Sequence, residues 1–180
     1  MKQFARTLAT LTLGFSVYAS AEAVPHMYGQ VAAEQGVPAD IFYALVLAES
    51  QSKTQQGFKP WPWTINYKGH PHFFQTRSEA YAFASHLNDI GEQLFDIGLA
   101  QVNWRWHKDR FGYDLWSAFD PYTNLTAAAQ HLREQYERDE CNNWAIAIGC
   151  YHRPGRRDSD IKIAERYANR VIDIWESKFM

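Results

Sequence analysis

Hydrophobic residues recur every three to four positions along most of the chain, which is the spacing of one buried face of an α-helix. Near the C-terminus, Ile161, Ala164, Ala168, Val171 and Trp175 fall on one such face. Internal repeats and low-complexity tracts are absent from the sequence, so the pattern predicts a single, mainly α domain. The predicted helices are residues 22–35, 38–50, a segment that opens at 76, a segment from 121 to 136, 144–151 and 161–175.

The third of these helices has a clear start signal. Thr76-Arg77-Ser78-Glu79 matches the capping box, in which a threonine and a glutamate three residues later each bond the other's backbone N–H group. The pattern therefore predicts that a helix begins here. The residues expected on its inner side are Tyr81, Ala84, Leu87 and Leu94.

A small β excursion interrupts the helical pattern between the second and third helices. The polar run 51–56 is typical of a loop, and the two prolines that follow exclude a helix interior. Residues 63–67 alternate large and polar side chains, Lys68-Gly69 is a turn signal, and 70–74 resumes an extended pattern. This arrangement predicts a β-hairpin.

The helix over residues 38–50 carries the first candidate for chemistry. Ile41, Leu45 and Ala48 form its apolar face, and Glu49 lies at the edge of that face. A carboxyl group half-withdrawn from water ionises less readily, so its pKa rises and it can hold a proton near neutral pH. Such a group can serve as a general acid. The alternative is a glutamate at a helix end that points into solvent, as ionisable side chains usually do.

Composition narrows the class of partner. The 180 residues suit one compact domain. Aromatic residues make up 16% of the chain, more than a small core needs, which leaves rings available for ligand stacking. The formal net charge is -2, and residues 1–21 contain two basic residues and no acidic one, so the remainder is more acidic still. This balance argues against nucleic acid as the main partner.

The first 21 residues have the three parts of an export signal. Lys2 and Arg6 form a basic start, residues 8–18 an apolar region, and Ala19-Ser20-Ala21 a small-residue cleavage site. The apolar part is too short and too rich in threonine to remain as a membrane-spanning helix, and no other stretch is long and apolar enough. We therefore expect a signal peptide over residues 1–21, a mature domain over 22–180, and no stable membrane anchor.

The chain has two cysteines, Cys141 and Cys150, and an exported protein can form a disulfide. If residues 143–150 are helical, a rise of about 1.5 Å per residue separates the ends of that segment by roughly 10 Å. A disulfide needs Cα atoms within about 7 Å, so Cys141 would have to fold back beside the helix. A bridge and two buried thiols both remain open on this reasoning.

Residues 95–107, FDIGLAQVNWRWH, combine amides with aromatic rings. Gly98 permits an unusual backbone angle, and Gln101 and Asn103 place two amide side chains close together. Amides pair with hydroxyl groups and a pyranose face stacks on indole, so these amides beside Trp104 and Trp106 favour a sugar-binding surface. A loop whose amides are structural is the alternative.

Three motifs, taken in order, resemble those of the lysozyme-like soluble lytic transglycosylases. They are Glu49-Ser50 at a helix end, Gly98-Leu99-Ala100-Gln101-Val102-Asn103, and Ala147-Ile148-Gly149-Cys150-Tyr151. The family has a Glu-Ser pair, a Gly-Leu-Met-Gln-Ile-Asn-like segment and an Ala-Tyr-Asn-Ala-Gly-like segment. The resemblance covers roughly residues 38–175, with 57–94 as an insertion. It implies a mainly α, lysozyme-like domain with a small β-hairpin.

The resemblance also implies a mechanism. Glu49 would act as the catalytic acid and then as the base. It would cleave the β-1,4 bond between N-acetylmuramic acid and N-acetylglucosamine while the muramic 6-hydroxyl attacks the anomeric carbon, which leaves a 1,6-anhydro end. Ser50 would orient Glu49, and Tyr151 would reach toward the acid. The residues expected to bind substrate or shape the cleft are Ser50, Gln101, Asn103, Trp104 and Tyr151.

The sequence departs from the family pattern at three places. Ala100 replaces a methionine, which is a packing change, and His152-Arg153 replaces Asn-Ala after the tyrosine. The third is Asp96, because the strand that it opens also resembles the active-site strand of animal-type lysozymes, where the aspartate is the second carboxylate. Retaining hydrolases need two carboxyl groups about 5 Å apart. Asp96 is therefore a second catalytic candidate and a hydrolytic muramidase the alternative activity, while a structural aspartate that caps a turn is also open.

Small exported members of this family accompany secretion, pilus and conjugation machines and open peptidoglycan locally. The resemblance therefore implies a periplasmic protein, glycan strands as substrate, and components of such a machine as partners. A catalytically silent glycan-binding scaffold is the rival from another class. No cofactor, metal or obligate oligomer is expected, so the protein should be a monomer. His70 and His72 share a strand face, but they lack a third ligand nearby and fit ordinary surface histidines.

Overall fold

The computed structural model describes residues 22–54 and 57–180, so the predicted signal peptide over 1–21 lies outside the described residues. The architecture is mainly helical with a small antiparallel sheet, which confirms the predicted fold class. The helices are α1 (His26–Glu34), α2 (Ala39–Ser50), α3 (Arg77–Asp89), α4 (Trp104–His107), α5 (Leu115–Ala118), α6 (Pro121–Tyr136), α7 (Trp144–His152) and α8 (Asp158–Phe179). The strands are β1 (Gln51–Thr54), β2 (Gly57–Pro60), β3 (Thr64–Tyr67), β4 (His70–Phe73), β5 (Phe95–Ile97) and β6 (Val102–Asn103), and two 3-10 helices are η1 (Lys108–Phe111) and η2 (Asp139–Cys141).

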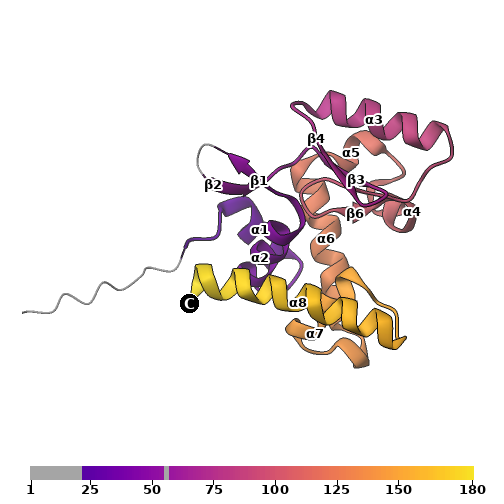
Figure 1. Cartoon of the computed structure of the whole chain (residues 1–180). Coiled ribbons are helices and arrows are strands. Elements are labelled where there is room, and N and C mark those ends of the chain that lie inside the picture. The colour runs from indigo at the N-terminus through magenta and orange to yellow at the C-terminus, as the bar shows by residue number, and fades with distance from the viewer. Residues whose placement is uncertain (1–21, 55–56) are drawn as a thin grey trace, which may run out of the picture.

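The elements form two lobes joined by α6, which Figure 1 shows running from one lobe to the other. One lobe contains the sheet with α3, α4 and α5. The other contains α1, α2, α7 and α8, and α8 packs on both α2 and α7. Because the candidate motifs come from both lobes, the space between the lobes is where their side chains can meet.

Helix α2 is the centre of its lobe. The sequence predicts one apolar face through Ile41, Leu45 and Ala48, but the structure buries the helix almost all round. Ile41 and Ala48 are only half-buried at its edges. A helix that is apolar on all sides belongs inside a domain, where neighbours cover every face. Its fully buried side chains are those of Phe42, Ala44, Leu45, Val46 and Leu47.

The main sheet has the strand order β4-β3-β5-β6, with antiparallel neighbours throughout. The predicted hairpin is confirmed as β3–β4, and its turn residues Lys68 and Gly69 have φ values of 51° and 81°. Two positive φ values match the twist of paired strands. The polar run 51–56, predicted to be a loop, instead begins with β1, which pairs with β2. Backbone hydrogen bonds alone define such a ribbon, so no alternation of apolar side chains announced it.

The capping box at the start of α3 is confirmed. Thr76 accepts from the backbone N–H of Glu79, and Glu79 accepts from that of Thr76. The predicted inner face is partly wrong, because Tyr81 is 38% exposed and Leu94 is 52% exposed. Leu94 lies beyond the end of α3, so helical spacing no longer applies to it. The side chains that α3 buries are Ala80, Ala84 and Leu87.

Helix α6 begins after Asp120, as predicted. It carries a buried amide side chain, Asn124, that bonds the backbone of the lobe that contains the sheet. The Asn124 side chain is 1% exposed. Its Nδ2 donates to the carbonyl oxygens of Ile97 (3.0 Å) and Ala118 (3.1 Å), and its Oδ1 accepts from the N–H of Ala100 (3.0 Å). Gly98 lies directly against it with φ 78°, and a Cβ there would sit 2.3 Å from Asn124 Nδ2. The conformation of the Gly98 turn is therefore fixed by a side chain from another element.

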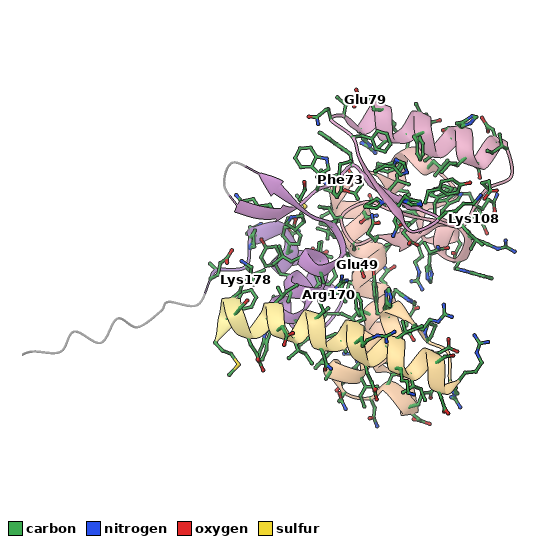
Figure 2. The ribbon with its side chains drawn as sticks, in the orientation of Figure 1. Glu49, Phe73, Glu79, Lys108, Arg170 and Lys178 are labelled. Carbon is green, nitrogen blue, oxygen red and sulfur yellow. A yellow bond between two sulfur atoms is a disulfide. The ribbon has the colours of Figure 1, made fainter. Side chains whose placement is uncertain are left out.

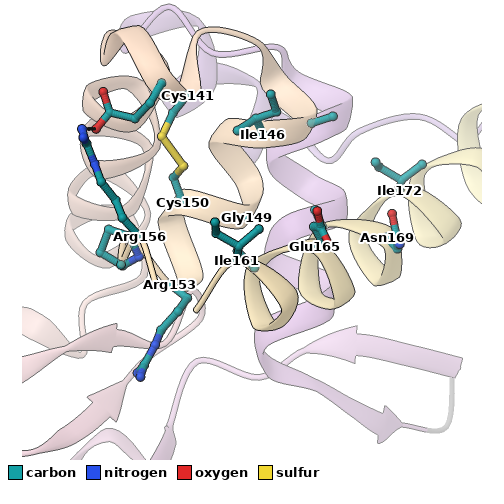
Figure 3. Close-up of a pocket in the computed structure, with 16 residues that line it drawn as sticks. Cys141, Ile146, Gly149, Cys150, Arg153, Arg156, Ile161, Glu165, Asn169 and Ile172 are labelled. Atoms are coloured by element: carbon teal, nitrogen blue, oxygen red, sulfur yellow. Dashed lines mark hydrogen bonds and ion pairs between the residues drawn. A yellow bond between two sulfur atoms is a disulfide. The ribbon is translucent and has the colours of Figure 1, made fainter. Parts of the chain in front are cut away.

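The two cysteines are joined. Cys141 folds back beside α7 through η2 and forms a disulfide with Cys150, with Cα atoms 6.6 Å apart. Beside the bridge, an apolar hollow of about 740 Å³ lies between α7 and α8 (Figure 3). Ile146 and Ile161 border it and are 47% and 44% exposed, although the spacing of the final helix predicts a buried position for Ile161. Both lie in helices as predicted, but among the described residues no further element covers this side.

Within the described residues, no single helix is both long and apolar enough to cross a membrane. Helices α1 and α2 pass that test only together, and they are bent by 116° at the break between them.

Replacing Gly98 with alanine should destabilise the protein strongly, because an L-residue at φ 78° is strained and its Cβ meets the buried Asn124 amide. We expect a loss of about 2–4 kcal/mol in the free energy of unfolding, measured by urea denaturation. Gly69→Ala is the matched control: its φ is 81°, but a Cβ there meets no atom within 4 Å, so it should cost about 1 kcal/mol. Equal losses in the two variants would contradict the packing argument.

The disulfide should stabilise the fold by closing a short loop in the unfolded chain. For a sequence separation of 9, the chain-entropy relation gives about 2–3 kcal/mol. We expect dithiothreitol to lower the urea midpoint of the wild type accordingly. The double variant Cys141→Ser/Cys150→Ser should start at the lower midpoint and show no response to the reductant. A wild-type midpoint that is insensitive to complete reduction would show that the bridge adds no stability.

Candidate active site

A cavity of about 740 Å³ opens between the two lobes and brings together most of the predicted site residues. Glu49 and Tyr151 reach it from the helical lobe. Asp96, Gln101 and Asn103 reach it from the sheet and the turn before β6. Residues that are far apart in the sequence therefore line the same cavity. This is the arrangement expected if the three motifs form one site.

Glu49 lies at the last turn of α2, partly buried, with its carboxyl group facing this cavity. The hydroxyl of Tyr167 from α8 donates to its Oε1. Figure 2 shows Glu49 and Arg170 close together where α8 passes α2. Burial raises the pKa of Glu49 to about 7, opposed by the Tyr167 hydrogen bond and the positive charge of Arg170, while Asp96 adds a smaller increase. The carboxyl group can therefore hold or release a proton near neutral pH.

Two buried tyrosines flank Glu49 and stay protonated. Burial, followed by the Glu49 charge, holds the pKa of both Tyr151 and Tyr167 well above the usual value. Both phenols therefore remain hydrogen-bond donors throughout the accessible pH range. Tyr167 uses its hydroxyl on Glu49, whereas Tyr151 donates to the carbonyl of Ala100 at 2.8 Å. The direct contact with the acid thus comes from Tyr167, and Tyr151 contacts the Ala100 carbonyl instead.

Ser50 does not reach the cavity. It is 2% exposed, and its hydroxyl donates to the carbonyl oxygen of Leu99. This corrects the expectation that Ser50 contacts substrate, because its one hydroxyl proton is engaged by the backbone. The bond ties the end of α2 to the turn after β5, so Ser50 positions Glu49 and the amide segment relative to each other.

Gln101 lines the cavity from a strained backbone position. Its φ is 47°, and its Nε2 donates to the carbonyls of Gly98 (2.9 Å) and Thr64 (3.3 Å). Those two bonds hold the Gly98–Gln101 turn closed over β3. The amide nitrogen of Gln101 is therefore a structural donor, in agreement with the alternative that the sequence left open for this loop.

Asp96 on β5 faces the cavity beside Asn103. The Nδ2 of Asn103 donates to Asp96 Oδ1 at 2.7 Å. Burial raises the pKa of the Asp96 carboxyl above its ordinary value, and the Asn103 hydrogen bond opposes that rise. A second carboxyl group thus shares the cavity with Glu49, held in place by an amide from the neighbouring strand.

The two tryptophans of the WRW segment have opposite environments. Trp104 is 3% exposed, stacks on Phe111 and donates from Nε1 to Asn88 Oδ1 at 3.3 Å. It therefore belongs to the core, which corrects the expectation that it binds sugar. Trp106 is 67% exposed, lines the cavity and has the guanidinium of Arg105 over its ring. Residues two positions apart point to nearly opposite sides of an α-helix. The packing of α4 therefore decides which of the two rings is exposed.

The residues that depart from the family pattern have partners of their own. His152 stacks on Tyr167 with ring centroids 4.3 Å apart, and burial lowers its pKa. Arg153 forms an ion pair with the buried Asp160 at 2.8 Å. Both side chains line the cavity on the α7–α8 side. His152 thus packs beneath the tyrosine that holds Glu49, where it remains neutral at physiological pH.

Sequence reasoning missed Tyr167, Arg170 and Asn124. Tyr167 and Arg170 belong to a helix whose periodic spacing indicates only an inward face. Asn124 gives a weak signal, as a polar side chain beside the apolar stripe of α6. Among the described residues, no group of three or more His, Cys, Asp or Glu side chains could hold a metal ion.

The family relationship agrees with this geometry. Comparison of the chain with curated proteins and with solved structures gave no match. The family model described as the transglycosylase SLT domain matches residues 27–171, which spans most of the chain and includes every predicted site residue. At the family level, this domain indicates lytic transglycosylase activity on peptidoglycan. The chain belongs to the transglycosylase SLT domain family.

Proposed function

We propose that this protein cleaves the β-1,4 bond between N-acetylmuramic acid and N-acetylglucosamine and leaves 1,6-anhydromuramic ends. The observation that carries the proposal is Glu49, a carboxyl group with a pKa raised to about 7 by burial, which faces a cavity between two lobes. Near neutral pH such a group is present in both protonation states. One side chain can therefore supply the acid for the first step and the base for the second.

In the first step, protonated Glu49 gives its proton to the glycosidic oxygen. The bond from that oxygen to the anomeric carbon breaks, and the N-acetylglucosamine chain leaves with a free 4-hydroxyl. The carboxylate that forms is stabilised by the Tyr167 hydroxyl and by the positive charge of Arg170. In the second step, Glu49 takes the proton of the muramic 6-hydroxyl while its oxygen bonds the anomeric carbon. Protons balance over the two steps, and no water is consumed.

Asp96 supports the positive charge that develops at the anomeric carbon. It shares the cavity with Glu49 and is held by Asn103, so a second carboxyl group lies on the sheet side of the cavity. The same observation favours a second candidate function, hydrolysis by a muramidase that uses Glu49 and Asp96. Mass spectrometry of the released fragments separates the two, because anhydro ends mean transglycosylation and reducing ends mean hydrolysis.

The protein is proposed to act in the periplasm after export, and to open the wall locally for an envelope-spanning secretion, pilus or conjugation machine. The export signal read over residues 1–21 supports the first part. The Cys141–Cys150 disulfide supports it independently, since such bridges persist in oxidising compartments. Cell fractionation with N-terminal sequencing of the mature protein tests it, and a cytoplasmic, unprocessed chain would contradict it.

Glu49→Gln should abolish release of soluble muropeptides from purified sacculi, because glutamine keeps the shape but cannot donate the proton. We expect the rate to fall by at least 10²- to 10⁴-fold, the contribution of a positioned general acid, with binding to sacculi retained. The control is Glu165→Gln, an exposed residue on α8, which should retain the wild-type rate.

Stability gives a second readout for the same variant. The pKa of Glu49 is higher in the folded than in the unfolded chain, so the folded state binds more protons between about pH 4.5 and pH 7. As the pH rises through that window, the stability of the wild type should therefore fall relative to that of Glu49→Gln. The difference between the two proteins isolates Glu49 from the buried histidines, whose lowered pKa values act in the opposite direction in both. A Glu49→Gln variant that clears sacculi at the wild-type rate would refute the acid assignment.

Tyr167→Phe should shift the pH dependence of the reaction. The lost hydroxyl stabilises the ionised form of Glu49, so its removal raises the pKa of Glu49 further above about 7. In the free enzyme the acid must be protonated, so the decline of kcat/KM on the alkaline side should move to higher pH. Rates of muropeptide release measured from pH 5 to pH 9 test this. An alkaline limb that stays in place, or moves to lower pH, would show that Tyr167 does not act on Glu49.

A further inference from the structure

Three buried side-chain atoms have no hydrogen-bond partner among residues 22–54 and 57–180: Asn66 Oδ1, Asn103 Oδ1 and His131 Nδ1. All three residues line the active-site cavity. A buried polar atom without a partner is costly, so native structures rarely keep one unless something else supplies the bond. Two of them, the amide oxygens of Asn66 and Asn103, come from the same sheet wall of this cavity, which indicates that groups of a bound ligand supply their missing partners.

Two of these atoms lie on either side of Asp96. In the sheet, Asn66 of β3 is directly opposite Asp96 of β5, and Asp96 is directly opposite Asn103 of β6. Directly paired residues project from the same face of a sheet, and neighbouring strands are about 4.8 Å apart. The three side chains therefore form a row that crosses the strands, with about 10 Å between its ends.

The chemistry of the row specifies what it can bind. Asn103 uses its Nδ2 on Asp96, which leaves its carbonyl oxygen as the group without a partner. Asn66 likewise presents a carbonyl oxygen. Both atoms accept hydrogen bonds and cannot donate them, so the ligand must bring N–H or O–H donors to both ends of the row.

A β-1,4-linked glycan meets this requirement, because it is extended and repeats its hydroxyl and acetamido donors at every sugar. A strand that lies along the row would place its donors on the two amide oxygens while a glycosidic bond passes Asp96. His131, from α6, lies away from the sheet, and its Nδ1 is 3.9 Å from Oε2 of Glu134, a residue that does not line the cavity. Burial and the neighbouring His107 lower its pKa to about 4, so it stays neutral and presents no competing charge.

We propose that Asn66 is a substrate-binding residue, and that the row Asn66–Asp96–Asn103 directs the glycan strand across β3, β5 and β6. This rests on the proposed function and extends it, because it fixes the direction of the strand relative to the sheet. It also gives the β3–β4 hairpin, which the family motifs leave unassigned, a direct part in the site.

Asn66 is tested by binding, separately from the chemistry, in the inactive Glu49→Gln background. The probes are peptide-free glycan strands from purified sacculi, of disaccharide and longer lengths, titrated by calorimetry. Asn66→Leu and Asn66→Ala should each weaken binding of the longer strands by about 3- to 10-fold, the effect of one hydrogen bond. The gain in affinity from disaccharide to longer strands should shrink in both variants. Asn142→Leu, at an exposed position outside the cavity, should bind like the parent.

Thermal melting separates binding from structure. Asn66→Leu removes a buried acceptor that has no partner in the free protein, so its melting temperature should equal or exceed that of the parent. Weaker binding together with a melting temperature lowered by several degrees in both variants would assign Asn66 a structural role and overturn the proposal. Unchanged affinity in both variants would overturn it as well. A Glu49→Gln parent that binds no glycan strand would instead refute the proposed function, and the inference with it.

Discussion

The removal of one carboxyl group from water is the constraint on which this site depends. Helix α2 is apolar on nearly every side and carries Glu49 in its last turn, so the fold brings that carboxyl to the edge of the cavity. Burial alone would raise the pKa of this carboxyl further. Tyr167 and Arg170 from α8 oppose it, and the pKa settles at about 7. The packing of α8 on α2 therefore sets the chemistry, although α8 contains none of the three family motifs.

The amide segment is held by partners outside itself. Asn124 from α6 bonds the backbone on both sides of Gly98, Ser50 bonds the carbonyl of Leu99, and Tyr151 bonds the carbonyl of Ala100. Each bond comes from a different helix, so the turn after β5 is fixed relative to α2, α6 and α7 at once. Several motif residues thus use their side chains to hold the backbone of the site in place. The same fold retains a buried carboxyl and three unpartnered polar atoms in one cavity, a cost in stability that is typical of functional sites.

The sequence alone determined most helices, because helical spacing and capping signals are local. The α3 capping box, the start of α6 after Asp120 and the Lys68-Gly69 turn are present as predicted. The β1–β2 ribbon was missed, since backbone hydrogen bonds can pair polar strands without any apolar alternation. The burial of individual side chains was predicted less well than the positions of the helices. Ile161 has inward spacing, yet no element in the described part of the chain covers it, because helical spacing does not specify which neighbours pack on a face.

For the site, the sequence identified Glu49 and Asp96 as the carboxyl groups, because an acid at the edge of an apolar face and a motif in the right order are visible in one dimension. Only the tertiary structure decided which side chains touch them. Tyr167 comes from a helix more than a hundred residues away. Trp104 and Trp106 were both expected at a sugar-binding surface, but the fold buries Trp104 and leaves only Trp106 exposed. Contacts of this kind depend on how distant elements pack, and residue spacing along a chain carries no record of it.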